Sequence, residues 1–316
     1  MTINRKKTVK VSAPGKIILS GEHAVVYGYP TLLAAVNRRL TLRLNKRKND
    51  IKVVSNYPPY LAKYGLRKVG QKLRLNSNQG WRVKIDSTIP MTGGMGSSAA
   101  LSVAITAALY WSTRNNWDIE KINRLAYEIE KKQHGNPSGG DNTVSAYGGF
   151  LWYRKESEDL KNFSSLTPKN KIKIVIIDTG NPVENTGDMV EKVKQMRQFN
   201  KKEVEGIFKE MEEITRSFLR FLTGERSYNL SNLLNKNQEL LERIGIVSPE
   251  SSRLIKKIKS SGGAAKVSGA GRWKKGSGII LAYHKDPNRL MDFVKRNKLK
   301  CFQVKLGEEG VRVEKS

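Results

Sequence analysis

The sequence predicts an α+β fold, and two observations lead to that prediction. Segments with strand character and segments with helix character do not alternate as regularly as a doubly wound parallel sheet requires. The composition also changes near residue 180, where mixed signals give way to helices with charged outer faces. A chain of 316 residues is long enough for two domains, since one domain takes roughly 100–200 residues. We therefore expect a first domain over 1–180 and a second over 181–316.

In the first part, strand signals precede two helices. The sequence Ala13-Pro14-Gly15 predicts a turn between two short strands. The helix expected over Ser97–Arg114 is filled with small and apolar residues, whereas the helix over Ile119–Gln133 has apolar residues near a 3.6-residue period. Residues 134–140 are turn formers and predict a loop. The expected strands are Val9–Ser12, Lys16–Ser20, Leu40–Leu44, Ile51–Ser55 and Trp81–Ser87.

The second part follows an apolar strand expected over Ile172–Asp178. Its helices and strands come in blocks, and its final segment mixes strand signals with one helix. The expected helices are Glu184–Phe199, Lys202–Leu222, Tyr228–Ile244 and Pro287–Asn297. The expected strands are Ala264–Ser268, Gly278–Tyr283, Cys301–Leu306 and Val311–Val313.

Composition excludes several protein classes. No apolar run approaches the roughly 18 residues that a membrane span needs, so no membrane partner is expected. The basic segment Met1–Lys10 is not followed by a signal-peptide core, so we expect a cytoplasmic protein. The single cysteine, Cys301, excludes an intramolecular disulfide and a metal site built from thiolates.

The net charge of +29 comes from 58 Lys and Arg against 29 Asp and Glu. Such a charge is compatible with nucleic-acid binding through phosphate contacts. The basic runs are scattered, however, and no ladder of stacking aromatic residues is interleaved with them. We therefore expect no nucleic acid as the main partner. A small anionic substrate such as a nucleotide is attracted by the same field.

The first segment with chemical character is Pro14–Gly28, in which Lys16, Glu22 and His23 surround a turn and a strand end. A lysine supplies a point charge suited to a phosphate or a developing alkoxide. The Glu–His pair can hydrogen-bond a small polar ligand. A surface hairpin with incidental charge explains each of these residues equally well when it is taken alone.

The second segment, Pro90–Ala100, is a glycine-rich turn that leads into a helix. Such a turn exposes unpaired backbone N–H groups and the positive end of the helix dipole, which together bind anions. It lacks the Gly-Lys-Ser/Thr ending of a P-loop. Ser97 or Ser98 could also act as a simple helix cap, but three glycines within four positions, 93 to 96, exceed what capping needs.

The third segment runs from Glu130 through the turn formers 134–140 to Asp141. Glu130 lies one helical turn before His134, so both leave the same face of the helix. Two carboxylates beside a phosphate cradle fit one metal ligand and one base. The alternative is that Asp141 caps the structure that follows.

A fourth segment, Gly262–Gly271, is a strand that runs into Gly-Ala-Gly and is followed by Arg272–Lys275. Glycines there let the backbone approach a ligand closely. A β-turn accounts for the same pattern.

Taken together, these segments resemble the GHMP kinase superfamily, and within it the mevalonate kinase family. Residues 14–28 are similar to the family's first motif, 90–100 to its ATP-binding motif, 134–142 to its His-Gly-x-Pro-Ser-Gly-x-Asp-Asn segment, and 266–271 to the start of its third motif. The resemblance implies an N-terminal domain like ribosomal protein S5 domain 2 and a ferredoxin-like C-terminal domain. It further implies phosphorylation of the primary hydroxyl of (R)-mevalonate with ATP and Mg²⁺, in isoprenoid biosynthesis, by a homodimer.

The resemblance also implies roles for individual residues. Asp141 matches the family's catalytic base, and Lys16 matches the lysine that lies near the transferred phosphoryl group. Ser98 and Glu130 match the Mg²⁺ ligands. The ATP phosphates are expected at Gly93, Gly94, Met95, Gly96, Ser97 and Ser98. The substrate is expected at Lys16, Glu22, His23, Asp141, Thr186 and Ala270.

This sequence departs from the family pattern at three places. Met95 stands where leucine is more usual, and Gly140 replaces a more common aliphatic residue before Asp141. After Gly-Ala-Gly the family continues with more glycine, whereas Arg272-Trp273-Lys274-Lys275 intervenes here. The three extra cations keep a second hypothesis open, a phosphomevalonate kinase or decarboxylase of the same superfamily. A third hypothesis, motivated by the net charge, is a basic nucleic-acid-binding protein on an S5-like scaffold.

Overall fold

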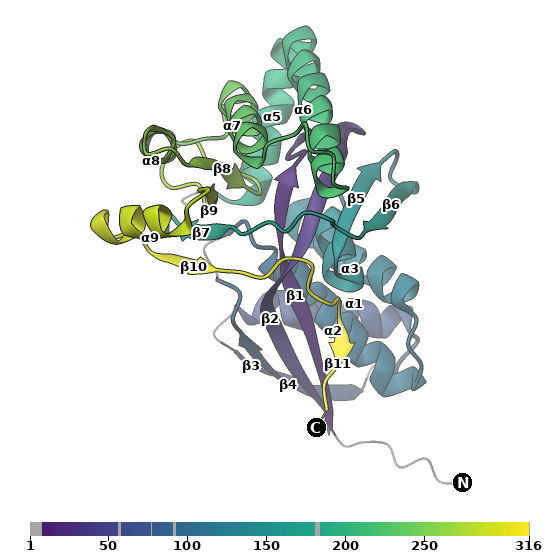
Figure 1. The fold of residues 1–316 in the computed structure, drawn as a ribbon. Helices are drawn as coiled ribbons and strands as arrows, with labels where there is room; N and C mark the ends of the chain where they lie inside the picture. The colour runs from purple at the N-terminus through teal and green to yellow at the C-terminus, as the bar shows by residue number, and fades with distance from the viewer. Residues whose placement is uncertain (1–7, 56–57, 77, 91–92, 181–183, 316) are drawn as a thin grey trace.

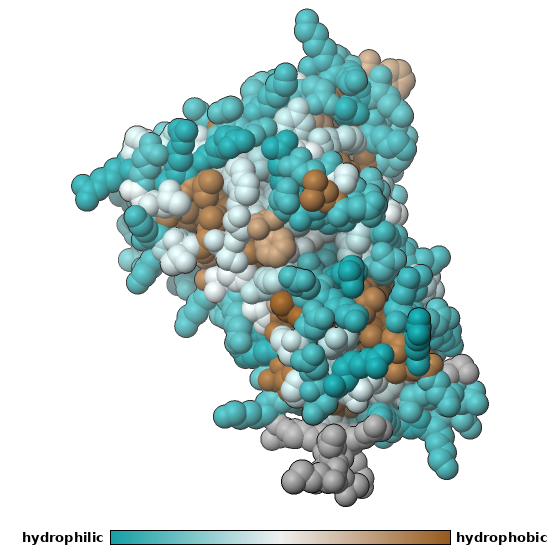
Figure 2. Space-filling model, turned by 90° about the vertical axis from the view of Figure 1, so that its right-hand side faces the viewer, coloured by the Kyte–Doolittle hydropathy of each residue, from teal (hydrophilic) through white to brown (hydrophobic). Residues whose placement is uncertain are grey.

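The computed structural model describes residues 8–55, 58–76, 78–90, 93–180 and 184–315 (Figure 1). Most of the basic segment at residues 1–10, and positions 91 and 92 of the glycine-rich segment, therefore lie outside the described residues. Within the described ranges, no helix combines the length and the apolar composition needed to cross a bilayer. Figure 2 shows one face of the molecule, which is mainly hydrophilic with apolar residues in separate spots.

Two β-sheets organise the chain. The first has the order β11-β1-β2-β4-β3, and β5 pairs with both β2 and β6. Its strands are β1 (Thr8–Ser20), β2 (Pro30–Lys48), β3 (Ile51–Val54), β4 (Gln79–Ser87), β5 (Phe150–Lys155), β6 (Lys161–Leu166) and β11 (Arg312–Val313). The second is an antiparallel sheet of order β10-β7-β9-β8. Its strands are β7 (Val175–Asp178), β8 (Ala264–Ser268), β9 (Ile279–Tyr283) and β10 (Cys301–Gln303).

The helices fall into two groups (Figure 1). The first group packs with the first sheet and comprises α1 (Pro59–Lys72), α2 (Ser97–Arg114), α3 (Ile119–His134) and α4 (Gly140–Tyr147). The second comprises α5 (Thr186–Phe199), α6 (Lys201–Leu222), α7 (Leu230–Arg243), α8 (Pro249–Ser260) and α9 (Pro287–Arg296). Side chains from all five helices of this second group enclose an apolar core with the second sheet.

Helix α2 is the centre of the first core. Every residue from Ala99 to Tyr110 is buried, because α2 contacts α1 and α3 as well as β1 and β2. A helix surrounded in this way needs apolar or small residues on every face rather than one apolar stripe. The composition of the Ser97–Arg114 segment is thereby explained, and its predicted bounds are confirmed.

The predicted turn at Ala13-Pro14-Gly15 is wrong. Residues 8–20 form one strand, β1, which pairs with β2 on both sides of Pro14. A register shift between Pro14 and Gly15 skips two residues of β2. This bulge accommodates the proline, which has no N–H to donate to the ladder.

The sequence analysis also missed several elements. Helices α1 and α8, the β5–β6 hairpin, the short 3-10 helix at Ala24–Tyr27 and most of the length of β2 were not predicted. Helix α1 connects β3 to β4, which are parallel, and parallel neighbours require such a crossover. The predicted loop over 134–140 is shorter than expected, because α3 includes His134 and α4 begins at Gly140.

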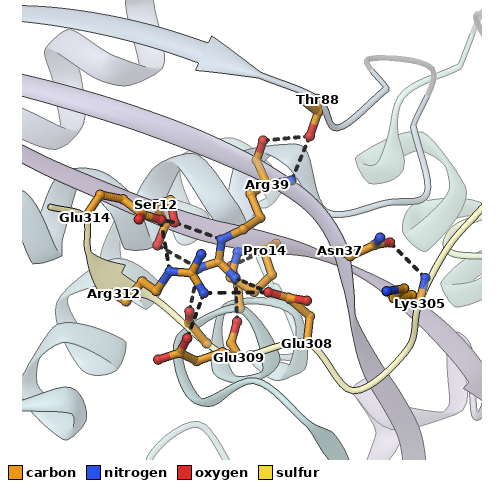
Figure 3. A network of polar contacts seen from close by, with 12 residues as sticks. Ser12, Pro14, Asn37, Arg39, Thr88, Lys305, Glu308, Glu309, Arg312 and Glu314 are labelled. Atoms are coloured by element: carbon orange, nitrogen blue, oxygen red, sulfur yellow. Dashed lines mark hydrogen bonds and ion pairs between the residues drawn. The ribbon is translucent and has the colours of Figure 1, made fainter.

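Arg39 fastens the segment around β11 to the first sheet (Figure 3). Its guanidinium donates to the Ser12 hydroxyl at 2.8 Å and to the backbone oxygens of Glu309 and Gly310, each at 2.7 Å. Arg312 pairs with Glu314 at 2.9 Å on the same segment. These contacts hold β11 against β1, so the second half of the sequence returns to the first sheet.

Candidate active site

A cavity brings the four sequence segments together. It lies where the end of β1, the glycine-rich loop before α2, the start of α4 and the segment after β8 meet. The predicted residues that line it are Lys16, Glu22, His23, Gly93, Gly94, Gly96, Ser97, Ser98, Glu130, Asp141, Thr186 and Ala270. Met95 is the exception: its side chain is buried in the core, and only its backbone oxygen reaches β1, where it accepts from the Lys16 N–H at 2.9 Å.

Lys16 and Asp141 form an ion pair inside this cavity, with Nζ and Oδ2 separated by 3.1 Å. The lysine side chain is buried, whereas the aspartate is 39% exposed and so accessible to a ligand. Gly96 makes room for the lysine, because a Cβ at position 96 would lie 2.8 Å from Lys16 Cγ. Asp141 stands in the first turn of α4 but does not cap it, since Gly139 is the N-cap residue.

The glycine-rich loop presents the N-terminus of α2 to the cavity. Gly93, Gly94 and Gly96 all have positive φ angles, which only glycine adopts without strain. Gly96 is the N-cap residue and no side chain caps the helix, so the alternative of a serine cap is wrong. The first N–H groups of α2 are therefore left for an anion, as at other phosphate-binding helix ends.

Gly94 also lies against the second sheet. A Cβ at Gly94 would lie 2.7 Å from the backbone oxygen of Ser268, and one at Gly269 would lie 2.8 Å from Gly94 Cα. The two glycine segments thus meet backbone to backbone. The second and fourth sequence segments consequently form adjacent parts of one wall.

Ser98 and Glu130 lie side by side at the base of the cavity. The Ser98 hydroxyl donates to Glu130 Oε2 at 3.2 Å, and the Ser102 hydroxyl donates to Oε1 at 2.7 Å. Burial raises the pKa of Glu130 to about 7, with the charge of Asp141 adding to the effect and the hydrogen bond from Ser102 opposing it. His134 Nε2 lies 3.2 Å from the Ser98 hydroxyl, and burial lowers the pKa of His134.

These two residues fit a divalent cation. A hydroxyl and a carboxylate are oxygen ligands of the kind that Mg²⁺ prefers, and the Ser98 hydroxyl lies within 3.2 Å of Glu130 Oε2, so the two oxygens are adjacent. Among the described residues no group of three or more His, Cys, Asp and Glu could hold a metal. A cation at this place would therefore take its other ligands from phosphate and water.

Glu22 has both carboxylate oxygens engaged by the protein. Oε1 pairs with Lys266 of β8, and Oε2 accepts from the Asn237 amide of α7 at 3.3 Å. Both ion-pair partners are fully buried. Burial lowers the pKa of Lys266, and the charge of Glu22 partly offsets this. Lys266 stands in a segment that the sequence analysis singled out for its glycines, and its partner could not be inferred there.

His23 is held in one protonation state. Its Nε2–H donates to the backbone oxygen of Ala270 at 2.9 Å, and burial lowers the pKa of His23 to about 4. A neutral ring that donates from Nε2 has a free lone pair on Nδ1. His23 can consequently accept a hydrogen bond from a ligand hydroxyl.

The Arg272–Lys275 segment contributes none of the residues identified in the cavity wall. Arg272 is buried, whereas Lys274 and Lys275 are exposed. The backbone N–H of Lys274 donates to Glu184 at 3.0 Å, and Lys192 lies 4.5 Å from the ring centre of Trp273. The segment thus packs beside α5, and its three extra cations do not line the described part of the cavity.

Comparisons with known sequences point to one family of proteins. A model of the GHMP kinase N-terminal domain matches residues 35–149. The mevalonate kinase of Archaeoglobus fulgidus is 32% identical over 96% of this chain and 99% of its own length. The mevalonate kinase of Schizosaccharomyces pombe is 27% identical over 97% of this chain and 92% of its own length.

Solved structures give the same result for the fold. The structure of L. major mevalonate kinase in complex with R-mevalonate matches with a TM-score of 0.82 and 25% identity, over 97% of this chain and 98% of that chain. The mevalonate kinase of Methanococcus jannaschii matches with a TM-score of 0.79 and 22% identity, over 96% and 100% of the two chains. The predicted GHMP kinase fold is thereby confirmed.

Proposed function

The chain belongs to the mevalonate kinase family of the GHMP kinases, and we propose that it transfers the γ-phosphoryl group of ATP to the C5 hydroxyl of (R)-mevalonate. The observation that carries the proposal is the Lys16–Asp141 pair, which stands in one cavity with the uncapped helix N-terminus of α2. A base, a fixed cation and an anion cradle are the parts that phosphoryl transfer needs.

Asp141 accepts the proton of the attacking hydroxyl. The oxygen of that hydroxyl forms a bond to the γ-phosphorus while the bond from that phosphorus to the β,γ-bridging oxygen breaks, and ADP leaves with the electron pair. Lys16, whose ammonium lies 3.1 Å from Asp141, forms a charge-assisted hydrogen bond that holds the carboxylate in place before transfer. Its ammonium also offsets the charge that develops near the transferred group.

The backbone N–H groups at the start of α2 bind the phosphates of ATP, and the positive φ angles of Gly93, Gly94 and Gly96 shape the loop around them. Ser98 and Glu130 would hold Mg²⁺, which when bound would neutralise phosphate charge.

We place mevalonate against His23 and Ala270, which line the same cavity as Asp141. His23 Nδ1 accepts a hydrogen bond from a substrate hydroxyl, because its Nε2–H is already used on Ala270. Glu22 and Thr186 complete the substrate side of the cavity. Since Lys266 and Asn237 hold both oxygens of Glu22, Glu22 acts on the substrate from a fixed position.

A coupled assay of ADP release tests the proposal, with Mg²⁺-ATP and either mevalonate or 5-phosphomevalonate. The wild-type protein is expected to turn over mevalonate, and Asp141→Asn to lose at least a hundredfold in kcat, since a positioned base contributes about 10²–10⁴-fold. Asp86→Asn is the matched control, because Asp86 is an exposed carboxylate whose ion pairs, within the described ranges, are with Arg43 and Lys84 on the surface of the sheet. Turnover by Asp141→Asn at the wild-type rate would remove Asp141 from the mechanism.

The second substrate, 5-phosphomevalonate, is less well supported. It carries a further phosphate that needs cations, yet Lys16 is the one Lys or Arg in the described wall of the cavity and is already paired with Asp141. Turnover of 5-phosphomevalonate alone would overturn this reasoning.

Weak binding of nucleic acid at physiological salt is expected. The homodimer, the cytoplasmic location and the domain boundary near residue 180 stay predictions.

A further inference from the structure

The loop Asn136–Gly139, which leads into Asp141, has two different sides. One side lines the cavity, to which all four residues contribute. The other side is held by side chains from α3 and β5, none of which belongs to the catalytic set. These contacts hold the part of the chain that comes directly before α4 and Asp141.

Lys155, on β5, makes the most contacts with this loop. Its buried ammonium donates to the side-chain oxygen of Asn136 at 2.8 Å and to the backbone oxygen of Pro137 at 3.2 Å. It also forms an ion pair with Glu158 at 3.0 Å. The lysine thus joins the loop to the β5–β6 hairpin through charge-assisted hydrogen bonds, which are the stronger kind.

Two tyrosines support the same loop. The Tyr153 hydroxyl donates to the backbone oxygen of Ser138 at 2.7 Å. The Tyr127 hydroxyl lies 3.1 Å from the backbone oxygen of Pro137 and from both carboxylate oxygens of Glu158, so these acceptors share its one proton. Gly139 has a φ of +90°, and a Cβ there would lie 2.6 Å from the Tyr153 hydroxyl. The tyrosine hydroxyl therefore fills the space that any larger residue at 139 would need.

We propose that Lys155 is a positioning residue for phosphoryl transfer: with Tyr153 and Tyr127 it fixes the loop Asn136–Gly139, and through that loop the position of Asp141 and of the substrate wall. The proposal rests on the proposed function. Lys155 itself does not line the cavity in its described part, so it acts through the loop and not on the substrate.

The expected effect follows from the donors that the loop would lose. In Lys155→Met, the side-chain oxygen of Asn136 loses the lysine ammonium as its hydrogen-bond donor. Among the described residues, the backbone oxygen of Pro137 then keeps only the Tyr127 hydroxyl as a donor. A displacement of Asp141 by about 1 Å can reduce turnover by about a hundredfold. The glycine-rich loop before α2 makes no described contact with Lys155, so ATP binding should change little.

The experiment compares Lys155→Met, Lys155→Arg and Lys131→Met. Lys131 is the matched control, because it also pairs with Glu158, at 2.8 Å, and lies over the Tyr127 ring without bonding the loop. Steady-state kinetics are measured for mevalonate and for ATP separately. We expect Lys155→Met to lower kcat/KM for mevalonate at least tenfold with KM for ATP within twofold, Lys155→Arg to recover most of the loss, and Lys131→Met to resemble the wild type.

Hydrogen exchange of peptides covering residues 134–141 is measured on the same proteins without substrate. Faster exchange in Lys155→Met, but not in Lys131→Met, is the expected result, and this readout stays valid if mevalonate is not the substrate. Tyr153→Phe serves as the second variant should Lys155→Met fail to fold. Unchanged exchange, a KM for ATP that rises more than twofold in Lys155→Met, or no recovery with arginine would each overturn the proposal.

Discussion

Replacing Lys266 by methionine should destabilise the protein strongly, although no lysine would be expected in an apolar strand. Lys266 is 0% exposed on β8, and its ammonium bonds both Glu22 and the backbone oxygen of Ile18 at 3.2 Å. These bonds connect the second sheet to β1. Lys266→Met keeps the apolar stem of the side chain and removes the ammonium group with its hydrogen-bond donors.

The magnitude follows from what the change leaves behind. Glu22 would stay buried with one hydrogen bond, from Asn237 at 3.3 Å, and the oxygen of Ile18 would lose one of its two described side-chain donors. Removing one partner of a buried ion pair costs about 3–5 kcal/mol. That is a large share of a typical stability of roughly 5–15 kcal/mol. The double variant Lys266→Met/Glu22→Gln has no charge at either of these two buried positions and should be more stable than Lys266→Met alone.

Urea unfolding at pH 7, with linear extrapolation to water, measures these free energies. Lys259→Met is the control, because Lys259 forms an exposed pair with Glu239 at 3.2 Å and should change stability by less than about 1 kcal/mol. The reasoning is refuted if Lys266→Met is as stable as this control. It is also refuted if the two substitutions at Lys266 and Glu22 are additive.

Three other outcomes follow from the same structure. Burial lowers the pKa of His23 in the folded protein to about 4, from an ordinary value of about 6.5, so the unfolded chain binds more protons between these pH values. Stability should therefore rise with pH there by at most about 1.4 kcal/mol per unit, and urea unfolding at pH 5 and 7 should show a smaller slope for His23→Gln. Gly94→Ala should raise KM for ATP about tenfold, because the φ angle of Gly94 is +89° and a Cβ there would lie 2.7 Å from the backbone oxygen of Ser268. Gly206→Ala is the control and should leave the kinetics unchanged, because a Cβ at Gly206 would meet no atom within 4 Å. Arg39→Met should lower the free energy of unfolding by about 2 kcal/mol, since backbone oxygens around β11 lose their donor; an unchanged urea midpoint would contradict this.

Local sequence signals were sufficient where the local preference and the tertiary environment agree. The helix over Ser97–Arg114 was predicted with its bounds because small apolar residues suit both a helix and burial on every face. The segment at Pro14 shows the opposite case. Its turn formers favour a break, but pairing with β2 on both sides keeps the strand continuous through a bulge, and that pairing is not visible locally.

Elements with weak local signals were missed. Helix α1 contains Gly65, whose Cβ would lie 2.9 Å from Ile129, and Gly70 follows in the same helix. These glycines lower the helix signal, while close packing on α3 explains why the helix forms around Gly65.

The cavity residues were recognised from short motifs, but their connections were not. Glu22 reads in the sequence as a free carboxylate for a ligand, whereas in the structure Lys266, 244 positions away, occupies one of its oxygens. Lys155 carried no signal either, because its partners on the loop lie 18 and 19 positions before it without a regular period.

The pairing of β1 with β11 has a consequence for synthesis on the ribosome. Ser12 bonds Glu314, 302 positions later, so the outer edge of β1 cannot acquire this neighbour until nearly all of the intervening chain has left the exit tunnel. During that interval the nascent protein displays an unpaired strand edge, the feature by which polypeptides associate with one another. Translation at about 5–20 residues per second makes the interval some tens of seconds. A chaperone bound to the emerging chain would shield that edge until β11 arrives.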